Sequence, residues 1–217
     1  MIPVIIQLGP LPINSFGLLL VLALLAGWAR LVLDLKWAGE DSEQAERIVF
    51  WAGVGGVLGA RLAFIASFPQ QLLSDPVGAV FGGAGFVYYG GLLGGTLAVM
   101  YLIKRNGASV WKYSDLVTPT LAIGYAVGRI GCQLSGDGDY GIASELPWAV
   151  SFAHGVVPTA PGVRVHPTPV YETLAALLIA FILAHLIRSR RFSVAGQVMG
   201  VYLILTSLER FLVEFVR

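Results

Sequence analysis

The chain has 217 residues, of which 56% are hydrophobic and only 12% are charged. This charged share is about half of what a globular protein usually carries, and the mean hydropathy is +0.76. Because a soluble protein must keep a wetted surface, the composition excludes an ordinary soluble domain and favours a membrane protein. With 14 Lys and Arg against 13 Asp and Glu, the net charge is only +1. The chain therefore lacks the strongly positive surface that binds nucleic acid.

Six stretches are apolar and long enough to cross a bilayer, which takes about 20 residues of helix. They are residues 13–33, 46–68, 86–103, 114–134, 168–187 and 194–216. The first does not fit a cleaved signal peptide, because no basic residue precedes Arg30 and the apolar run is longer than a signal core. The expected fold class is therefore all-α, a polytopic membrane helix bundle of six spans that forms a single domain over residues 1–217.

Basic residues in the connections predict the orientation, because cytoplasmic loops carry an excess of Lys and Arg. The connections after the first, third and fifth spans hold Arg30, Lys36, Arg47, Lys104, Arg105, Lys112, Arg188, Arg190 and Arg191. On the other side only Arg164 lies clear of a span. The sequence thus predicts that both termini lie outside. It also predicts that residues 131–167 form a small external cap between the fourth and fifth spans.

The polar residues of the predicted spans gather at their outer ends, although a charged residue in a span costs roughly 2.5–3.5 kcal/mol. Arg129 and Arg210 lie on different spans at similar depth, and two guanidinium forks match a phosphate. Arg210, Glu214 and Arg217 share one helix face, whereas Glu209 is expected to face elsewhere. The other outer polar residues are Arg61, Tyr88, Tyr89, His166, Tyr171 and Glu172.

Simpler interpretations remain open for several of these residues. A single arginine near a helix end, such as Arg61, can extend to phosphate headgroups. Tyr88 and Tyr89 could belong to an aromatic belt at the membrane interface.

Glycine patterns in the second and third spans favour close helix packing. They are Gly55xxxGly59, Gly90xxxGly94 and Gly91xxxGly95. Gly90 and Gly91 follow Tyr89 directly, so they could also let backbone amides approach a ligand.

The sequence predicts no metal site and no cofactor. It has one cysteine, Cys132, and three scattered histidines without the spacing of metal ligands. Residues 136–141, GDGDYG, fit the GxGxxG pattern, but they follow a membrane span and their two carboxylates would repel a pyrophosphate. Cys132 is expected to be a small buried residue rather than a nucleophile.

The segment from Gly128 to Gly141, GRIGCQLSGDGDYG, resembles the signature of the prolipoprotein diacylglyceryl transferase family. Four further segments resemble the family in the same order: LGPL at 8–11 with SFG at 15–17, GARL at 59–62, YGGL at 89–92 and HPTPVYE at 166–172. The closing segment RFLVEFVR, at 210–217, is similar to the family's Arg…Glu…Arg segment. The resemblance covers nearly the whole chain.

This resemblance implies an integral enzyme of the bacterial inner membrane whose active site faces the outer side. Such an enzyme transfers the diacylglyceryl group of phosphatidylglycerol to the lipobox cysteine of a preprolipoprotein and releases glycerol phosphate. This transfer is the first step of lipoprotein maturation. The implied partners are phosphatidylglycerol, the lipobox peptide and membrane lipids, and a monomer is compatible with the sequence.

The resemblance and the polar pattern together give a set of expected site residues. Arg129 is expected to bind the phosphate of phosphatidylglycerol, and Arg210 to stabilise the departing phosphate. Glu214 is expected to hold Arg210 in place, and Tyr89 completes the catalytic set. The expected substrate-binding residues are Arg129, Arg61, Gly90, Gly91, Gly136, Asp137, Gly141, His166 and Glu172.

The chain departs from the familiar family pattern at several positions. Tyr89 stands where the family often has histidine, and Phe16 where many members have tyrosine. Cys132 and Ser135 stand in place of asparagines. Familiar members have a seventh span, whereas this chain ends at Arg217 after six expected spans.

An alternative function is a non-catalytic membrane protein that binds or transports anionic lipid, since an arginine cluster at headgroup depth could simply hold such a lipid. The sequence lacks an internal inverted repeat and a charged track through the inner halves of the spans, which argues against transport. A purely structural scaffold would explain neither the two arginines nor the signature.

Overall fold

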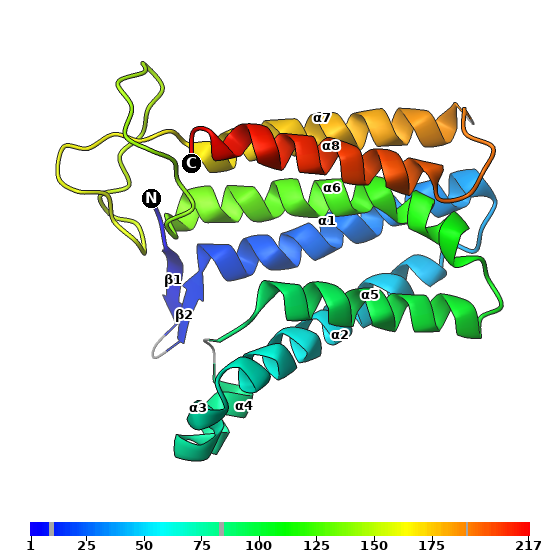
Figure 1. Cartoon of the computed structure of the whole chain (residues 1–217), viewed down its shortest axis with the longest axis horizontal. Coiled ribbons are helices and arrows are strands. Elements are labelled where there is room, and N and C mark those ends of the chain that lie inside the picture. The colour runs from blue at the N-terminus through cyan, green and yellow to red at the C-terminus, as the bar shows by residue number, and fades with distance from the viewer. Residues whose placement is uncertain (9–10, 83–84, 190) are drawn as a thin grey trace. The chain divides into compact units, whose positions relative to one another are not determined.

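A computed structural model describes residues 1–8, 11–82, 85–189 and 191–217 (Figure 1). Long helices occupy all the stretches predicted as spans: α1 (Ser15–Ala38), α2 (Gln44–Ser67), α5 (Tyr88–Arg105), α6 (Val110–Ser135), α7 (Thr168–Arg188) and α8 (Gln197–Glu214). Two short helices, α3 (Pro69–Ser74) and α4 (Pro76–Phe81), lie between α2 and α5. An antiparallel hairpin of β1 (Val4–Leu8) and β2 (Leu11–Asn14) precedes α1. The prediction of a helical chain is confirmed, while the sequence did not predict the hairpin.

Three sequence features named above lie outside the described residues. They are Gly9 and Pro10 of the LGPL segment and Arg190 of the basic connection after α7.

Three helices, α1, α2 and α7, are long and apolar enough to cross a membrane by length and composition. Large apolar side chains on them are exposed, among them Leu25, Phe50 and Phe181. Contact of so much apolar surface with water would be unfavourable, so these helix faces fit a lipid environment.

The helices group into two compact units. The first combines Met1–Gly39 with Ser114–Arg217, and the second is Glu40–Tyr113.

In the first unit, α6, α7 and α8 run alongside one another and α1 lies next to α6 (Figure 1). Gly27 lets α1 approach α6, because a Cβ there would lie 3.1 Å from Thr120 Cγ2. Asp115 of α6 caps the start of α8: its carboxylate accepts hydrogen bonds from the backbone amides of Gly196 (2.7 Å) and Met199 (2.8 Å). These contacts hold α1, α6 and α8 against one another, and α6 and α8 carry Arg129 and Arg210.

The connection between α6 and α7 is ordered by its own side chains. It begins at Gly136, because α6 continues to Ser135. Phe152 is buried and its ring stacks on that of Tyr140 with centroids 4.9 Å apart. Arg164 Nε donates a hydrogen bond to the carbonyl of Ala149 (2.9 Å).

In the second unit, α2 and α5 pack through their glycines. A Cβ at Gly59 would clash with the carbonyl oxygen of Gly90 and would lie 2.9 Å from Gly94 Cα. A Cβ at Gly94 would clash with the carbonyl oxygen of Gly55. The expected role of these patterns in helix packing is confirmed.

Candidate active site

Five charged residues meet in the first unit, and we call them the arginine–carboxylate cluster: Arg129, Asp139, Glu172, Arg210 and Arg217. Arg129 lies near the end of α6 and Glu172 near the start of α7. Arg210 lies near the end of α8, one turn before its last residue, Glu214. Helix ends and loops that are remote in the sequence therefore supply one site.

Glu172 is the centre of the cluster, and its side chain is 0% exposed. Its Oε2 lies 3.0 Å from Arg129 Nε, while its Oε1 lies 3.6 Å from Arg210 Nη1 and 3.9 Å from Arg217 Nη1. Tyr125 donates its hydroxyl proton to Oε1 at 3.0 Å. Three positive groups compensate the charge of this buried carboxylate.

The attraction between Glu172 and the arginines is mainly Coulombic. Despite the 3.0 Å distance, Arg129 Nε and Glu172 Oε2 are not aligned for a hydrogen bond. Arg210 Nη1 is also buried and has no hydrogen-bond partner among the described residues. At least two guanidinium N–H groups in the cluster are thus unused as hydrogen-bond donors by the described chain.

Two partly exposed carboxylates complete the ion pairs. Asp139 bridges two arginines: its Oδ2 pairs with Arg129 Nη1, and its Oδ1 lies 2.5 Å from Arg217 Nη2. Glu214 Oε2 lies 2.5 Å from Arg210 Nη2. The side chain of Asp139 is 31% exposed and that of Glu214 is 63% exposed. The inner carboxylate is therefore fixed, whereas the outer two face the surface.

Tyr125 and Glu209 extend the cluster. The guanidinium of Arg129 lies over the Tyr125 ring, 5.0 Å from its centroid. Glu209 interacts electrostatically with Glu172 and Arg129, and its Oε1 is buried without a hydrogen-bond partner among the described residues. The expectation that Glu209 faces away from Arg210, about 100° around α8, stays a prediction.

The glycines of the signature segment shape the loop that holds Asp139. Gly136 has φ of +61°, a left-handed conformation that glycine adopts without strain. A Cβ at Gly141 would clash with the carbonyl oxygen of Val216, and that oxygen accepts a hydrogen bond from the Ile142 amide at 3.0 Å. This close approach fixes the chain's last residues against the loop, so that Arg217 reaches Asp139.

His166 and Asp137 lie beside this loop. His166 Nδ1 is 3.2 Å from the Tyr171 hydroxyl, which accepts a 2.7 Å hydrogen bond from Trp148 Nε1. Asp137 Oδ1 accepts a hydrogen bond from the Asp139 amide at 3.3 Å. Both residues therefore belong to the segment that frames the cluster.

Cys132, Asp137 and Asp139 place three potential ligand atoms within 4.8 Å of one another. The carboxylate of Asp139 is already paired with Arg129 and Arg217. Two guanidinium groups on one ligand disfavour a cation beside it. The trio is better explained as part of the arginine–carboxylate network.

The second unit holds Arg61, whose guanidinium binds backbone carbonyls. Its Nη2 donates to Gly78 O (2.7 Å), its Nη1 to Gly85 O (2.9 Å) and its Nε to Val80 O (3.1 Å). Arg61 is buried and lies near the Phe86 ring, 5.3 Å from its centroid. These contacts tie α2 to the segment that follows α3.

Tyr89, Gly90 and Gly91 also belong to the second unit. Tyr88 and Tyr89 are both exposed and their rings meet edge to face, with centroids 5.5 Å apart. Gly90 faces Gly59, and a Cβ at Gly91 would lie 3.2 Å from the carbonyl oxygen of Gly56. The two glycines thus lie in the contact between α2 and α5.

Sequence reasoning missed Asp139 and Tyr125. Tyr125 precedes Arg129 by four residues, so the helical spacing on α6 was the signal for its contact with the guanidinium. Asp139 lies in an irregular loop, where no periodicity links it to Arg217.

The chain matches a known protein family over nearly its whole length. The family model described as prolipoprotein diacylglyceryl transferase matches residues 3–217. The chain is 35% identical over 207 residues to the phosphatidylglycerol–prolipoprotein diacylglyceryl transferase of Thermus thermophilus, covering 86% of this chain and 74% of the relative. The chain is 34% identical over 216 residues to the enzyme of the same name from Clostridium tetani, and the match covers 99% of this chain and 85% of the relative. It is 33% identical over 228 residues to the enzyme of the same name from Allorhizobium ampelinum, and that match covers 99% of this chain and 77% of the relative. The chain therefore belongs to the prolipoprotein diacylglyceryl transferase family and is a diacylglyceryl transferase.

Proposed function

We propose that the chain transfers the diacylglyceryl group of phosphatidylglycerol to the lipobox cysteine of a prolipoprotein, and that the arginine–carboxylate cluster handles the phosphate. One observation carries the assignment of the site. The guanidinium groups of Arg129, Arg210 and Arg217 all lie within 4 Å of one buried carboxylate, that of Glu172. Three such groups around one point are suited to grip an oxyanion through paired N–H donors.

The reaction places negative charge on the phosphate. The thiolate sulfur of the acceptor attacks the glyceryl carbon that bears the phosphate, a C–S bond forms and the C–O bond breaks. The electron pair leaves with the oxygen, and glycerol phosphate departs. Preorganised donors that face this oxygen stabilise the transition state most effectively. Arg129 binds the phosphate of the donor lipid, and Arg210 stabilises the departing phosphate.

The exposed carboxylates give way to the phosphate when the lipid binds. Asp139 and Glu214 are 31% and 63% exposed, so either side chain can turn into water at small cost. Glu172 has no exposed surface and stays in place as the internal counter-charge. In the bound state, the phosphate replaces Asp139 between Arg129 and Arg217, while Glu214 positions Arg210 before binding.

The acceptor thiol needs activation, because a free cysteine has a pKa of about 8.5. A positive neighbourhood favours the thiolate, and the three arginines supply one. The nucleophile belongs to the substrate, which is why Cys132 need not react. Tyr89 acts as a hydrogen-bond donor to the reacting groups; an unperturbed tyrosine is a poor base at neutral pH.

The other substrate-binding residues are proposed from the family resemblance. In the first unit, His166, Asp137, Gly136 and Gly141 line the loop around the cluster, where the headgroup and the lipobox peptide bind. In the second unit, Arg61, Gly90 and Gly91 form the framework that presents Tyr89.

We place all the long helices across the bacterial inner membrane, with both termini outside and the connection between α6 and α7, residues 136–167, as an external cap. The helices α6 and α8 are less apolar because they carry charged residues such as Arg129 and Arg210. Ion pairs compensate these groups inside the protein, so the helices can still lie in a bilayer. In this orientation the cluster lies on the outer side.

The test is a reporter peptide with a lipobox cysteine, incubated with the full chain in vesicles that contain phosphatidylglycerol. Mass spectrometry should show a gain equal to one diacylglyceryl group on the cysteine, and none on a matched peptide with serine at that position. The alternative function, a lipid binder, predicts that the chain retains phosphatidylglycerol while the peptide mass stays unchanged. That outcome would overturn the proposal.

A further inference from the structure

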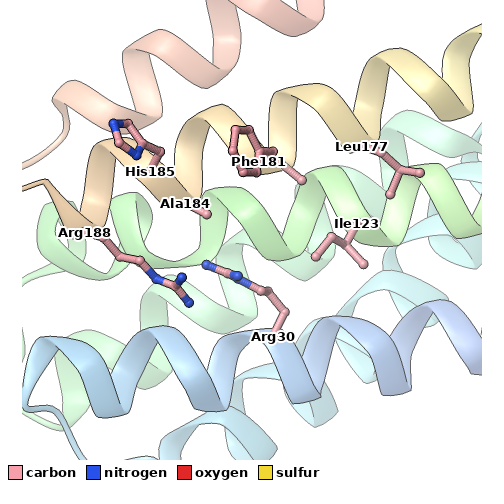
Figure 2. A pocket seen from close by; sticks show the side chains of 8 residues that line it. Arg30, Ile123, Leu177, Phe181, Ala184, His185 and Arg188 are labelled. Atoms are coloured by element: carbon pink, nitrogen blue, oxygen red, sulfur yellow. The ribbon is translucent and has the colours of Figure 1, made fainter.

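A groove runs along α7 from Leu177 to Arg188, and no residue of the arginine–carboxylate cluster lines it. It lies in the first unit between α1, α6 and α7 and has a volume of about 290 Å3 (Figure 2). This is near the lower limit of small-ligand sites, so the groove can hold a headgroup and the first part of a chain but not a whole lipid.

One end of the groove is cationic. Arg30 from α1 and Arg188 from α7 extend their guanidinium groups toward the same space (Figure 2). Arg188 is the last residue of α7, where the helix dipole favours a positive charge. Exposed His185 lies one turn earlier on the same helix.

The charges at this end do not cancel. Arg30 binds Asp34 with two hydrogen bonds, Nε to Oδ2 at 2.7 Å and Nη2 to Oδ1 at 2.5 Å. Asp34 is 1% exposed, so it holds Arg30 in a fixed position. Arg188 also attracts Asp34 electrostatically. Two arginines against one aspartate leave one positive charge facing the groove.

The other end is apolar. Leu177 and Phe181 of α7 are one turn apart on the same helix face, and Ile123 of α6 completes an apolar strip (Figure 2). Leu177 and Phe181 are exposed. The groove thus combines a cationic end with an apolar strip along the helix, which matches the chemistry of an anionic lipid.

We propose that this groove binds one anionic phospholipid of the inner leaflet, with its phosphate between Arg30 and Arg188 and one acyl chain along the apolar strip. Basic pockets between membrane helices on the cytoplasmic side recognise such headgroups. The excess positive charge selects an anionic lipid over a zwitterionic one. The phosphate end of the groove is separate from the proposed donor site, because Arg188 and Glu172 lie at opposite ends of α7.

The experiment uses the full chain in vesicles with photoactivatable phosphatidylserine or, as a matched zwitterionic probe, photoactivatable phosphatidylcholine. Cross-links are located by peptide mass spectrometry. We expect phosphatidylserine to label the peptide that contains Leu177 and Phe181 several-fold more strongly than phosphatidylcholine. Arg188→Gln should lower this labelling about fivefold, the factor that corresponds to about 1 kcal/mol per basic residue near a membrane.

Two further variants control for general charge and for folding. Arg191→Gln removes one positive charge from the neighbouring connection but not from the groove, and its labelling should stay within twofold of the original chain. Arg188→Lys keeps the charge and should retain most of the labelling.

Equal labelling by the two lipids would overturn the proposal, and so would an equal loss of labelling in Arg188→Gln and Arg191→Gln. Displacement of the lipid by inorganic phosphate, or cross-links from the groove to a second copy of the chain, would also overturn it. The proposal depends on the membrane placement but not on the transfer reaction. The groove can therefore fail to be labelled while the reporter peptide is still modified, and the peptide can stay unmodified while the groove is labelled.

Discussion

Arg129 Nε lies 3.0 Å from Oε2 of Glu172, a carboxylate with no exposed surface that also has Arg210 and Arg217 within 4 Å. The glutamate and the arginines depend on each other, because neither charge would be stable alone in this environment. Glu172 therefore sets the position of the guanidinium groups that the reaction requires.

Glu172→Gln keeps the shape of the side chain and removes its charge. Loss of one partner of a buried ion pair costs about 3–5 kcal/mol, so thermal unfolding in detergent should begin roughly 6–20 °C lower. Glu214→Gln is the matched control, because Glu214 pairs with Arg210 at the surface and its loss should cost at most about 1 kcal/mol. Equally small shifts in the two variants would show that Glu172 is not the centre of the network.

Asp139→Asn removes the carboxylate that competes with phosphate for Arg129 and Arg217. We expect the KM for phosphatidylglycerol to fall by roughly two- to fivefold, because a partly exposed ion pair is worth at most about 1 kcal/mol. Steady-state kinetics with the reporter peptide measures this change, and Asp41→Asn in the second unit should leave KM as it was. A rise in KM would mean that Asp139 positions the arginines rather than occupying the place of the phosphate.

Tyr89→Phe removes only the exposed hydroxyl that stands where the family often has histidine. A single hydrogen bond contributes about 0.5–1.5 kcal/mol, so the transfer rate should fall roughly 2- to 10-fold. Tyr88→Phe, the same change on the neighbouring exposed ring, should keep the original rate. Full activity of Tyr89→Phe would remove its hydroxyl from the mechanism.

Gly59→Ala tests the packing of α2 against α5. The added methyl would clash with the carbonyl oxygen of Gly90, and such overpacking costs about 1–3 kcal/mol. Gly53→Ala lies on the same helix with nothing within 4 Å of the new Cβ and should be neutral or slightly stabilising. The thermal midpoints of the two variants give the comparison, and similar values would contradict the close contact.

Much of the fold follows from the sequence, since long apolar runs predict helices whatever their neighbours. The helix ends were less predictable. The helix α1 continues past the expected end at residue 33 to Ala38, because Leu35 extends the buried face of Leu31 by one turn and a left-handed Gly39 then caps the helix. The arginines and Glu172 were predictable from the cost of charge in a span. The bridge between Asp139 and Arg217 was not, because it depends on how Gly141 lets the last residues pack against a loop.

The central claim is that the cluster's arginines act on the phosphate, and the mass of the reporter lipoprotein tests it most directly. Arg129→Lys and Arg210→Ala, each inserted in the membrane at the original level, should lower phosphatidylglycerol-dependent modification at least about 100-fold, as expected for loss of a preorganised donor. Arg191→Lys, in the connection after α7, should retain the full mass gain. Unchanged modification by both Arg129→Lys and Arg210→Ala would contradict the assignment of the phosphate to this site.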